Sequence, residues 1–145
     1  MKRLIYSLAF VAAIAAASTP AFAQQSGNLR VEFQGPGGHS SGAYGRVSAL
    51  HAAARAVILI QKALPSGSFQ ITNLTGGNSV NSIASDGLIE LRLNAGTADA
   101  YKALVEAVTK AAADGAAAEN TFRGVKPGDL TSGAPATVRS AVKPF

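Results

Sequence analysis

The residues of this chain with the clearest chemical potential lie in one glycine-rich stretch, residues 35–45. It reads Gly-Pro-Gly-Gly-His-Ser-Ser-Gly-Ala-Tyr-Gly and places His39 between glycines and hydroxyl side chains. An imidazole can bind a metal, transfer a proton or donate a hydrogen bond to an oxygen that gains negative charge. Glycine and proline free this stretch from regular structure. We therefore expect a functional loop, since a simple connection needs only about two to six residues and no imidazole.

The residues that would complete a histidine-based site are scarce. His51 is the only other histidine, cysteine is absent, and the eight acidic residues are scattered along the chain. A zinc site needs several clustered ligands. A serine-histidine-acid triad built from Ser40 or Ser41 with His39 is disfavoured, because sequence neighbours rarely point together and no G-x-S-x-G elbow is present. We expect neither a metal site nor a catalytic centre formed by this chain alone.

The N-terminal segment, residues 1–23, has the composition of a secretory signal peptide. Two basic residues precede an apolar run from 4 to 17, and Ala21-Phe22-Ala23 fits the small-x-small pattern of a cleavage site. The run is shorter than the about 20 residues that span a bilayer, which disfavours the alternative of an uncleaved anchor. We expect cleavage before Gln24, a periplasmic or secreted mature chain, and no membrane attachment afterwards.

The charge and the cysteine content limit the classes of function and the means by which the fold can be stabilised. The 145 residues carry a net charge of +5, and removing the two basic residues of the leader leaves 11 basic against 8 acidic residues, or +3. The basic residues are evenly spread, without a stripe or interleaved aromatic residues, which argues against nucleic-acid binding. Without cysteine there are no disulfides, so one domain must be stabilised by its core alone.

Hydrophobic periodicity predicts a regular order of elements. Strands with alternating apolar and polar residues are expected at 29–34, 68–75 and 88–94, and a less regular fourth strand at 120–126. Helical spacing is expected over 46–64, and from an N-cap at Thr97 to a glycine stop near Gly115. Residues 128–145 are rich in Ala, Ser, Thr and Pro, which predicts a flexible tail after a domain at 24–127.

This order of elements predicts an α+β, ferredoxin-like β-α-β-β-α-β sandwich, with a four-stranded antiparallel sheet and two helices on one face. The second strand, Ser68–Thr75, then lies at a sheet edge that carries no lysine, proline or inward charge. The helix Arg46–Leu64 is alanine-rich in its first half, which suits close packing on its own sheet or on a partner helix. We expect a homodimer formed through this strand and this helix.

Two motifs together carry a family resemblance. The loop at 35–45 and the segment Gly-Gly-Asn-Ser-Val-Asn-Ser-Ile at 76–83 resemble the dimerisation, or lid, domain of a zinc metallopeptidase family. That family includes aminoacylase, acetylornithine deacetylase, succinyl-diaminopimelate desuccinylase and peptidase T. The resemblance covers residues 29–126 and implies the same ferredoxin-like fold. In the family, the lid is inserted into a catalytic domain with two zinc ions, and it dimerises through an edge strand and the adjacent helix.

The resemblance also implies roles for individual residues. The family histidine at the position of His39 reaches into the partner subunit's active site and helps polarise the scissile carbonyl. The asparagine that matches Asn81 contacts substrate there, Ser40 belongs to the same motif, and Asn94 stands where the family has a carboxylate-binding arginine. The loops would be formed by Gly37, Gly38, Gly76 and Gly77. The sequence departs from the family at Ala84, usually proline, and at Ser48, usually asparagine.

The family's catalytic domain has no counterpart in the segments that we interpret as a leader and a tail. We therefore expect an exported, stand-alone dimerisation domain that is non-catalytic by itself and acts in self-association or in protein or ligand binding. The alternative is a lid that completes a zinc-dependent peptidase or amidohydrolase in trans, with zinc held by a separate catalytic chain. A third possibility is a relic of a truncated gene that folds without a selected role.

Overall fold

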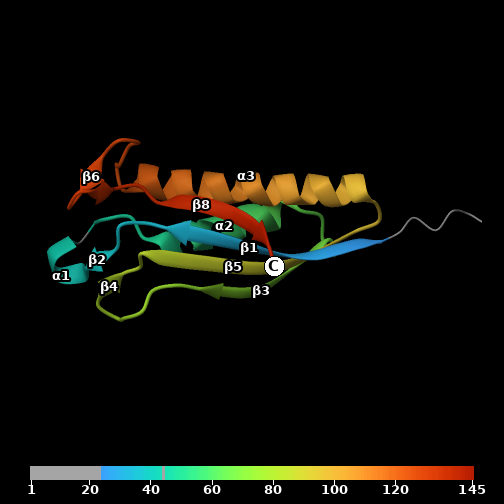
Figure 1. Ribbon diagram of the computed structural model, residues 1–145, viewed down its shortest axis with the longest axis horizontal. Coiled ribbons are helices and arrows are strands. Elements are labelled where there is room, and N and C mark those ends of the chain that lie inside the picture. The colour runs from blue at the N-terminus through green and yellow to red at the C-terminus, as the bar shows by residue number, and fades with distance from the viewer. Residues whose placement is uncertain (1–23, 44) are drawn as a thin grey trace, which may run out of the picture.

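The computed structural model describes residues 24–145 apart from residue 44, so the predicted signal peptide lies outside the described residues. The elements are β1 Gln25–Gln34, β2 Gly38–His39, α1 Ser40–Ala43, α2 Ala49–Ala63, β3 Phe69–Thr75, β4 Ser82–Ile83, β5 Asp86–Ala95, α3 Ala98–Phe122, β6 Leu130–Thr131, β7 Ala134–Pro135 and β8 Arg139–Pro144. Figure 1 shows α3 running the length of the sheet. Among the described helices, none combines the length and the apolar character needed to cross a membrane.

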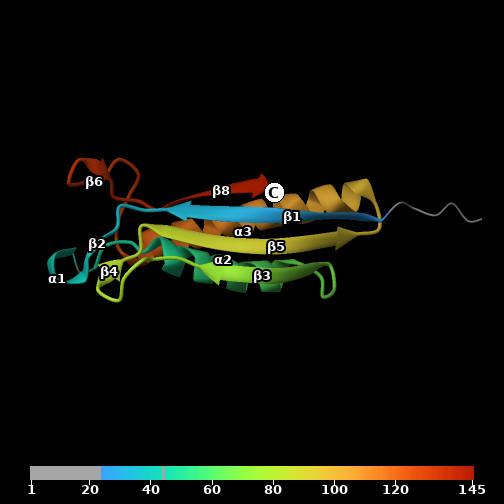
Figure 2. The same ribbon diagram turned by 60° about the horizontal axis from the view of Figure 1, so that its bottom comes forward.

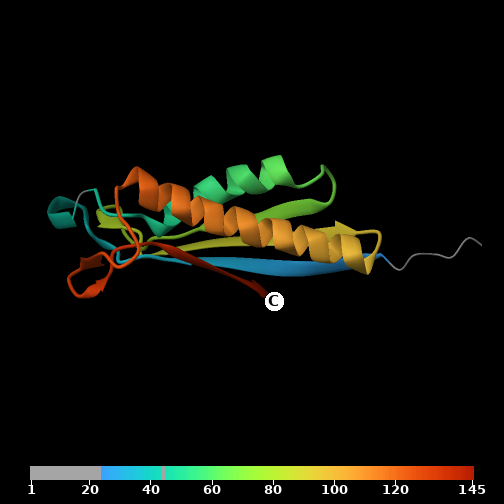
Figure 3. The same cartoon turned by 90° about the horizontal axis from the view of Figure 1, so that it is seen from above.

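The main sheet is antiparallel and has the order β3-β5-β1-β8, which Figure 2 shows face on. Seen from above in Figure 3, α2 and α3 lie together on one face of this sheet. Alternation places every second residue of the central strands in the core, with exposures between 0% and 3% for Leu29, Val31, Phe33, Ile89, Leu91 and Leu93. The predicted α+β, ferredoxin-like fold is confirmed, and so is the edge position of the strand at 68–75, here β3.

The alanine-rich face of α2 packs within the molecule. Ala49, Ala52, Ala53 and Ala56 are fully buried. A Cβ added at Gly115 of α3 would lie 2.8 Å from the Cβ of Ala56, a distance that real Cβ atoms do not reach. Gly115 is therefore a packing residue inside α3 and not the predicted helix stop. The small residues of α2 serve its own sheet and α3, so a partner helix is not needed to explain them.

The predicted fourth strand at 120–126 is wrong. These residues begin in the last turn of α3, which extends to Phe122, and Arg123 and Gly124 then end the helix with φ +68° at the glycine. The alanine-rich run before them favours helix more strongly than the short β-like pattern favours strand. The predicted helix stop near Gly115 divides one long helix into a helix and a strand.

The predicted flexible tail at 128–145 is also wrong. Residues 139–144 form β8, the fourth strand of the sheet, which pairs antiparallel with β1 from Gln34↔Arg139 to Leu29↔Pro144. Val138 is buried just before it, and β6 and β7 form a small hairpin on the way. The folded domain therefore extends beyond residue 127 to residue 144. The strand escaped prediction because its apolar residues are few and it is covered on one face only.

Candidate functional site

Two loops meet at one end of the sheet, where Figures 1 and 2 place α1, β2 and β4. The strands β2 and β4 pair through Gly38↔Ile83 and His39↔Ser82, and the backbone N–H of Ser40 donates to the carbonyl of Asn81 at 2.9 Å. The glycines permit this approach: Gly37 has φ +64°, a left-handed conformation that disfavours side chains. The two motifs from the sequence thus form one structural unit.

Gly76 lies at the start of the second loop, where the chain passes close to the backbone of β5. A Cβ at this position would lie 2.5 Å from the backbone oxygen of Asp86, so only glycine allows the chain to pass β5 here. Gly38 and Gly77 have positive φ angles as well. The four glycines that the sequence assigned to loop formation therefore all occupy positions that disfavour a side chain.

The exposed side chain of His39 is held between the two loops. The amide group of Asn81 lies 3.1 Å from His39 Nε2. On the other side of the ring, Ser41 approaches Nδ1 with its backbone N–H at 3.2 Å and its hydroxyl oxygen at 2.7 Å. The amide of Asn81 is itself in contact with the hydroxyl of Ser79. Residues 42 positions apart in the sequence thus fix one imidazole ring from both sides.

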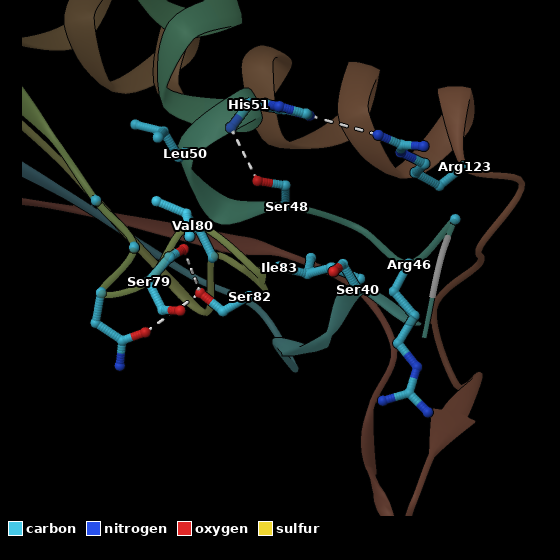
Figure 4. A pocket seen from close by; sticks show the side chains of 15 residues that line it. Ser40, Arg46, Ser48, Leu50, His51, Ser79, Val80, Ser82, Ile83 and Arg123 are labelled. Carbon is cyan, nitrogen blue, oxygen red and sulfur yellow. Dashed lines mark hydrogen bonds between the residues drawn. The ribbon is translucent and has the colours of Figure 1, made fainter. Parts of the chain in front are cut away.

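A cavity of about 720 Å³ opens beside these loops, against the start of α2. Figure 4 shows its walls: Ser48 and His51 at the helix start, Arg123 beyond them, and Val80 and Ile83 from the second loop. Its lining carries hydroxyl and cationic groups around aliphatic side chains, and no acidic residue is part of it. Such a lining suits a ligand with an apolar body and a carboxylate or carbonyl oxygen.

A buried carboxylate anchors the helix start behind this cavity. Glu119 of α3 has 0% exposure and accepts a hydrogen bond from the backbone N–H of Ser48 at 3.2 Å. It also accepts from Arg55 at 3.0 Å and from Arg123 at 3.2 Å. The Nδ1 of His51 lies 3.8 Å from the same carboxylate. Glu119 therefore ties the end of α3 to the residue that caps α2.

The electrostatics of Glu119 follow from these contacts. Burial alone would raise its pKa, because a carboxylate loses solvation in the interior. The hydrogen bonds from Ser48, Arg55 and Arg123 outweigh that effect, and the pKa of Glu119 lies below its ordinary value. The group is a charged structural anchor at neutral pH and not a proton donor.

Sequence reasoning did not single out Glu119, because it treated the eight acidic residues only as scattered along the chain. The signal was present in the helical spacing: the apolar stripe of α3 runs through Leu104, Val108 and Gly115, and the next position on that face is Glu119. A charged residue that continues a buried stripe needs partners. Arg55 supplies one of them from α2.

The other predicted site residues divide into two groups. His39, Ser40 and Asn81 lie together, whereas Asn94 sits near the opposite end of β5, eight positions from the site-proximal Asp86. That separation is about 26 Å along an extended strand. One copy of the chain thus does not bring Asn94 to His39. Within the described residues, no three His, Cys, Asp or Glu side chains form a group that could hold a metal ion.

Comparison with models of known families identifies the family of this chain. The model of the family described as "Peptidase dimerisation domain" matches residues 24–120, well over half of the chain. The chain belongs to the peptidase dimerisation domain family. The two loops of the site and the edge strand β3 all fall within the matched residues. Curated proteins provide no match.

Solved structures of longer proteins contain a similar fold. An aminobenzoyl-glutamate utilization protein from Klebsiella pneumoniae has a TM-score of 0.65 and 17% identity, over 83% of this chain and 28% of that one. A hydantoinase/carbamoylase family amidase from Burkholderia ambifaria has a TM-score of 0.65 and 21% identity, over 84% and 28%. A tripeptidase from Staphylococcus aureus has a TM-score of 0.60 and 17% identity, over 83% and 29%.

These similarities define what the peptidase dimerisation domain shares with the longer proteins. At such low identity they show the fold alone. The chain spans less than a third of the length of each of the three structures. The fold and the family are therefore established by the match, whereas a role in substrate binding or catalysis has to be argued from the residues of this chain.

Proposed function

We propose that this protein is an exported peptidase dimerisation domain that self-associates and presents His39 and Asn81 to an oxygen atom of a ligand, without catalysing a reaction by itself. The observation that carries the proposal is the juxtaposition of an open sheet edge with a histidine held in place by a second loop. Family membership supports self-association. The leader-like composition of residues 1–23 supports export to the periplasm or medium.

The proposed interface consists of β3 and the outer face of α2. All seven residues of β3 are uncharged and partly or fully exposed. Ile58 of α2 is 52% exposed and Leu74 of β3 is 42% exposed, which leaves aliphatic side chains uncovered on both elements. Pairing of two β3 strands would satisfy their free backbone groups. Burial of the aliphatic side chains adds a hydrophobic contribution.

Antiparallel pairing of two β3 strands would also bring the separated site residues together. The backbone N–H of Asn94 donates to Ser68, immediately before β3, at 2.8 Å, while the loop with Asn81 follows its other end. In a twofold-symmetric pair, the start of one strand lies beside the end of its partner. Asn94 of one copy would then lie on the same side as His39 of the partner copy.

A second candidate function is completion of a separate enzyme in trans. The named neighbours include a tripeptidase and an amidase, and this domain corresponds to less than a third of each. A hydrogen-bond donor such as His39 stabilises a developing oxyanion only beside an activated nucleophile. In this candidate, zinc and the general base come from the partner chain, and this chain binds no cofactor of its own.

Solution mass tests self-association. Sedimentation of the protein recovered after export of the full-length chain is expected to show a dimer that dissociates on dilution. A strict monomer at high micromolar concentration would contradict the first proposal. The same preparation tests export, because its N-terminal sequence is expected to begin at Gln24.

A pull-down from the exported fraction distinguishes the second candidate. A tagged copy is expected to retain only itself if the domain acts by self-association. Recovery of a second chain with zinc-dependent amide hydrolysis, lost when His39 is replaced by alanine, would favour completion in trans. Hydrolysis of N-acyl amino acids by the chain alone with added zinc would refute its non-catalytic role.

A further inference from the structure

The contacts around His39 restrict which ring nitrogen carries the proton. In a neutral imidazole one nitrogen donates and the other accepts. Three groups face this ring: the backbone N–H of Ser41 and its hydroxyl at Nδ1, and the Asn81 amide at Nε2. If the amide nitrogen of Asn81 donated to Nε2, both ring nitrogens would have to accept, and a neutral ring cannot do this.

The backbone N–H of Ser41 resolves the conflict. Of the three groups, it alone has a hydrogen whose direction is fixed by the backbone, since a hydroxyl hydrogen rotates and the two ends of a side-chain amide can exchange places. This N–H points at Nδ1 over 3.2 Å and needs a lone pair there. We infer that Ser41 holds the proton of neutral His39 on Nε2, with Asn81 oriented to accept it through its side-chain oxygen.

The surrounding contacts fit this orientation. The Ser41 hydroxyl, 2.7 Å from Nδ1, can donate to the same lone-pair region. In the structure the amide nitrogen of Asn81 lies at Nε2 and its oxygen accepts from the hydroxyl of Ser79. Exchanging the two ends of the amide places the oxygen at the Nε2–H group and the NH₂ group at the hydroxyl oxygen of Ser79, which then accepts instead of donating. The opposite tautomer would direct an N–H of His39 against the backbone N–H of Ser41. Two hydrogens facing each other repel, so this tautomer is disfavoured.

The consequence concerns the direction of the donor. An Nε2–H group points away from the first loop and toward the second, where a ligand oxygen could replace the oxygen of Asn81 as acceptor. Ser41 thereby acts as a positioning residue, because it contacts the ring and not the ligand. The use of this donor by a ligand rests on the proposed function, whereas the tautomer itself is a property of the isolated chain.

Long-range ¹⁵N–¹H correlation spectra of the full-length protein measure the tautomer directly, at about pH 9, above the ordinary histidine range. In the spectrum of His39, Nε2 is expected to have the shift of a protonated nitrogen and Nδ1 that of an unprotonated one. The exposed His51 supplies a reference in the same spectrum. A proton found mainly on Nδ1 of His39 would overturn the inference.

Variants at position 41 test the role of its hydroxyl. Ser41→Ala removes one donor to Nδ1 and keeps the backbone N–H, so the ratio of Nε2–H to Nδ1–H is expected to fall about fivefold, the factor that one neutral hydrogen bond supplies. Ser41→Thr keeps both donors and is expected to restore the ratio. An unchanged ratio in Ser41→Ala would remove the hydroxyl from the proposal.

Asn81→Asp tests the other side of the ring. Aspartate only accepts hydrogen bonds, so the Nε2–H tautomer is expected to persist in this variant. A transfer of the proton from Nδ1 to Nε2 on this substitution would mean that the native amide had donated, and would refute the inference. Because these spectra need no ligand and no partner, they can fail while self-association holds, and the reverse is also true.

Discussion

The two edges of the sheet differ in ways that separate their roles. β3 consists of uncharged residues from Phe69 to Thr75. β8 begins with Arg139 and ends with Lys143 and Pro144, residue types that discourage pairing with another strand. Lys143 also forms an ion pair with Glu32 of β1 at 2.6 Å. One edge thus carries residues that discourage strand pairing and the other does not, a difference that supports the proposed interface at β3.

The exposed side chains near the two edges differ as well. At the β8 edge, the ring of Phe145 lies under the guanidinium of Arg30, whose Cζ is 4.9 Å from the ring centroid. At the β3 edge, Ile58 and Leu74 present aliphatic surface. An aromatic ring can be covered by a cation, whereas aliphatic carbon is covered best by other apolar groups. The comparison predicts that β8 serves stability and β3 serves association.

Removal of β8 should produce the largest effect. Truncation after residue 137 deletes the buried Val138, the half-buried Val142 and the hydrogen bonds to β1. The expected loss is about 3–5 kcal/mol of unfolding free energy, since burial of one valine alone contributes about 1.5–3 kcal/mol. Urea unfolding followed by circular dichroism measures it. A truncated protein as stable as the parent would erase the proposed difference between the edges.

Charges at the open edge should affect association and spare the fold. The variant with Ile58→Glu and Leu74→Glu is expected to raise the dimer dissociation constant at least about 100-fold, because two apolar contacts become buried charges. Sedimentation measures the change, and the urea midpoint of the monomer should stay close to the parent's. The matched control is Ala141→Glu on β8, which is expected to leave the dimer intact. Equal weakening by the control would place the interface elsewhere.

The Glu119 cluster joins the helix nearer β3 to the helix nearer β8, and it should give the stability a pH dependence. The folded-state pKa of Glu119 is lowered, so its contribution is fully present above the ordinary glutamate pKa. That contribution is lost as the pH falls through the lowered folded-state value. Glu119→Gln is expected to cost about 2–3 kcal/mol at neutral pH, since Arg55 and Arg123 lose their carboxylate. The variant should also lose part of the acid dependence, as urea titrations from neutral to acid pH would reveal; an identical acid profile would contradict the role of Glu119.

The smallest effect on stability is expected at Phe145, the residue that follows β8. Phe145→Ala removes the ring that Arg30 covers and should lower stability by about 0.5–1 kcal/mol, the range of an exposed cation–π pair. Thermal unfolding measures the difference. Phe145→Tyr keeps the ring and serves as the control. A loss of stability clearly above this range would show that the ring of Phe145 contributes to the core.

The central sheet could be predicted from the sequence because its strands alternate. In β1 an apolar residue recurs at every second position, namely Leu29, Val31 and Phe33, and β5 shows the same alternation. A period of two residues places all these side chains on one face of the sheet. The second half of the chain was harder. Gly115 reads as a helix stop in isolation, and only its contact with Ala56 shows that the helix needs a glycine there. The segment 139–144 becomes the strand β8 through pairing with β1, since its own hydrophobic pattern is weak.

The candidate site was predictable in part for a related reason. The glycine-rich loops can be recognised from their composition, and the family resemblance of the two motifs assigned His39 and Asn81 to one site. Their direct contact joins residues far apart in sequence, and no local pattern encodes it. The distance of Asn94 from that pair is equally a property of the fold, since the orientation of β5 decides which of its ends faces the loops. The helical spacing of α3 indicates that Glu119 is buried, but no local pattern identifies Arg55 and the backbone N–H of Ser48 as its partners.

The placement of the loops at one end of the strands determines where the binding sites of a dimer would lie. If two copies pair antiparallel along β3, their loops point toward opposite ends of the assembly, and the dimer becomes a bivalent particle with well-separated heads. A small free ligand would gain nothing from this arrangement. A target that repeats the recognised group at matching spacing would be held by both heads, and the second attachment would benefit from a high effective concentration. Breaking the dimer would then weaken capture of a repetitive target far more than binding of the isolated group.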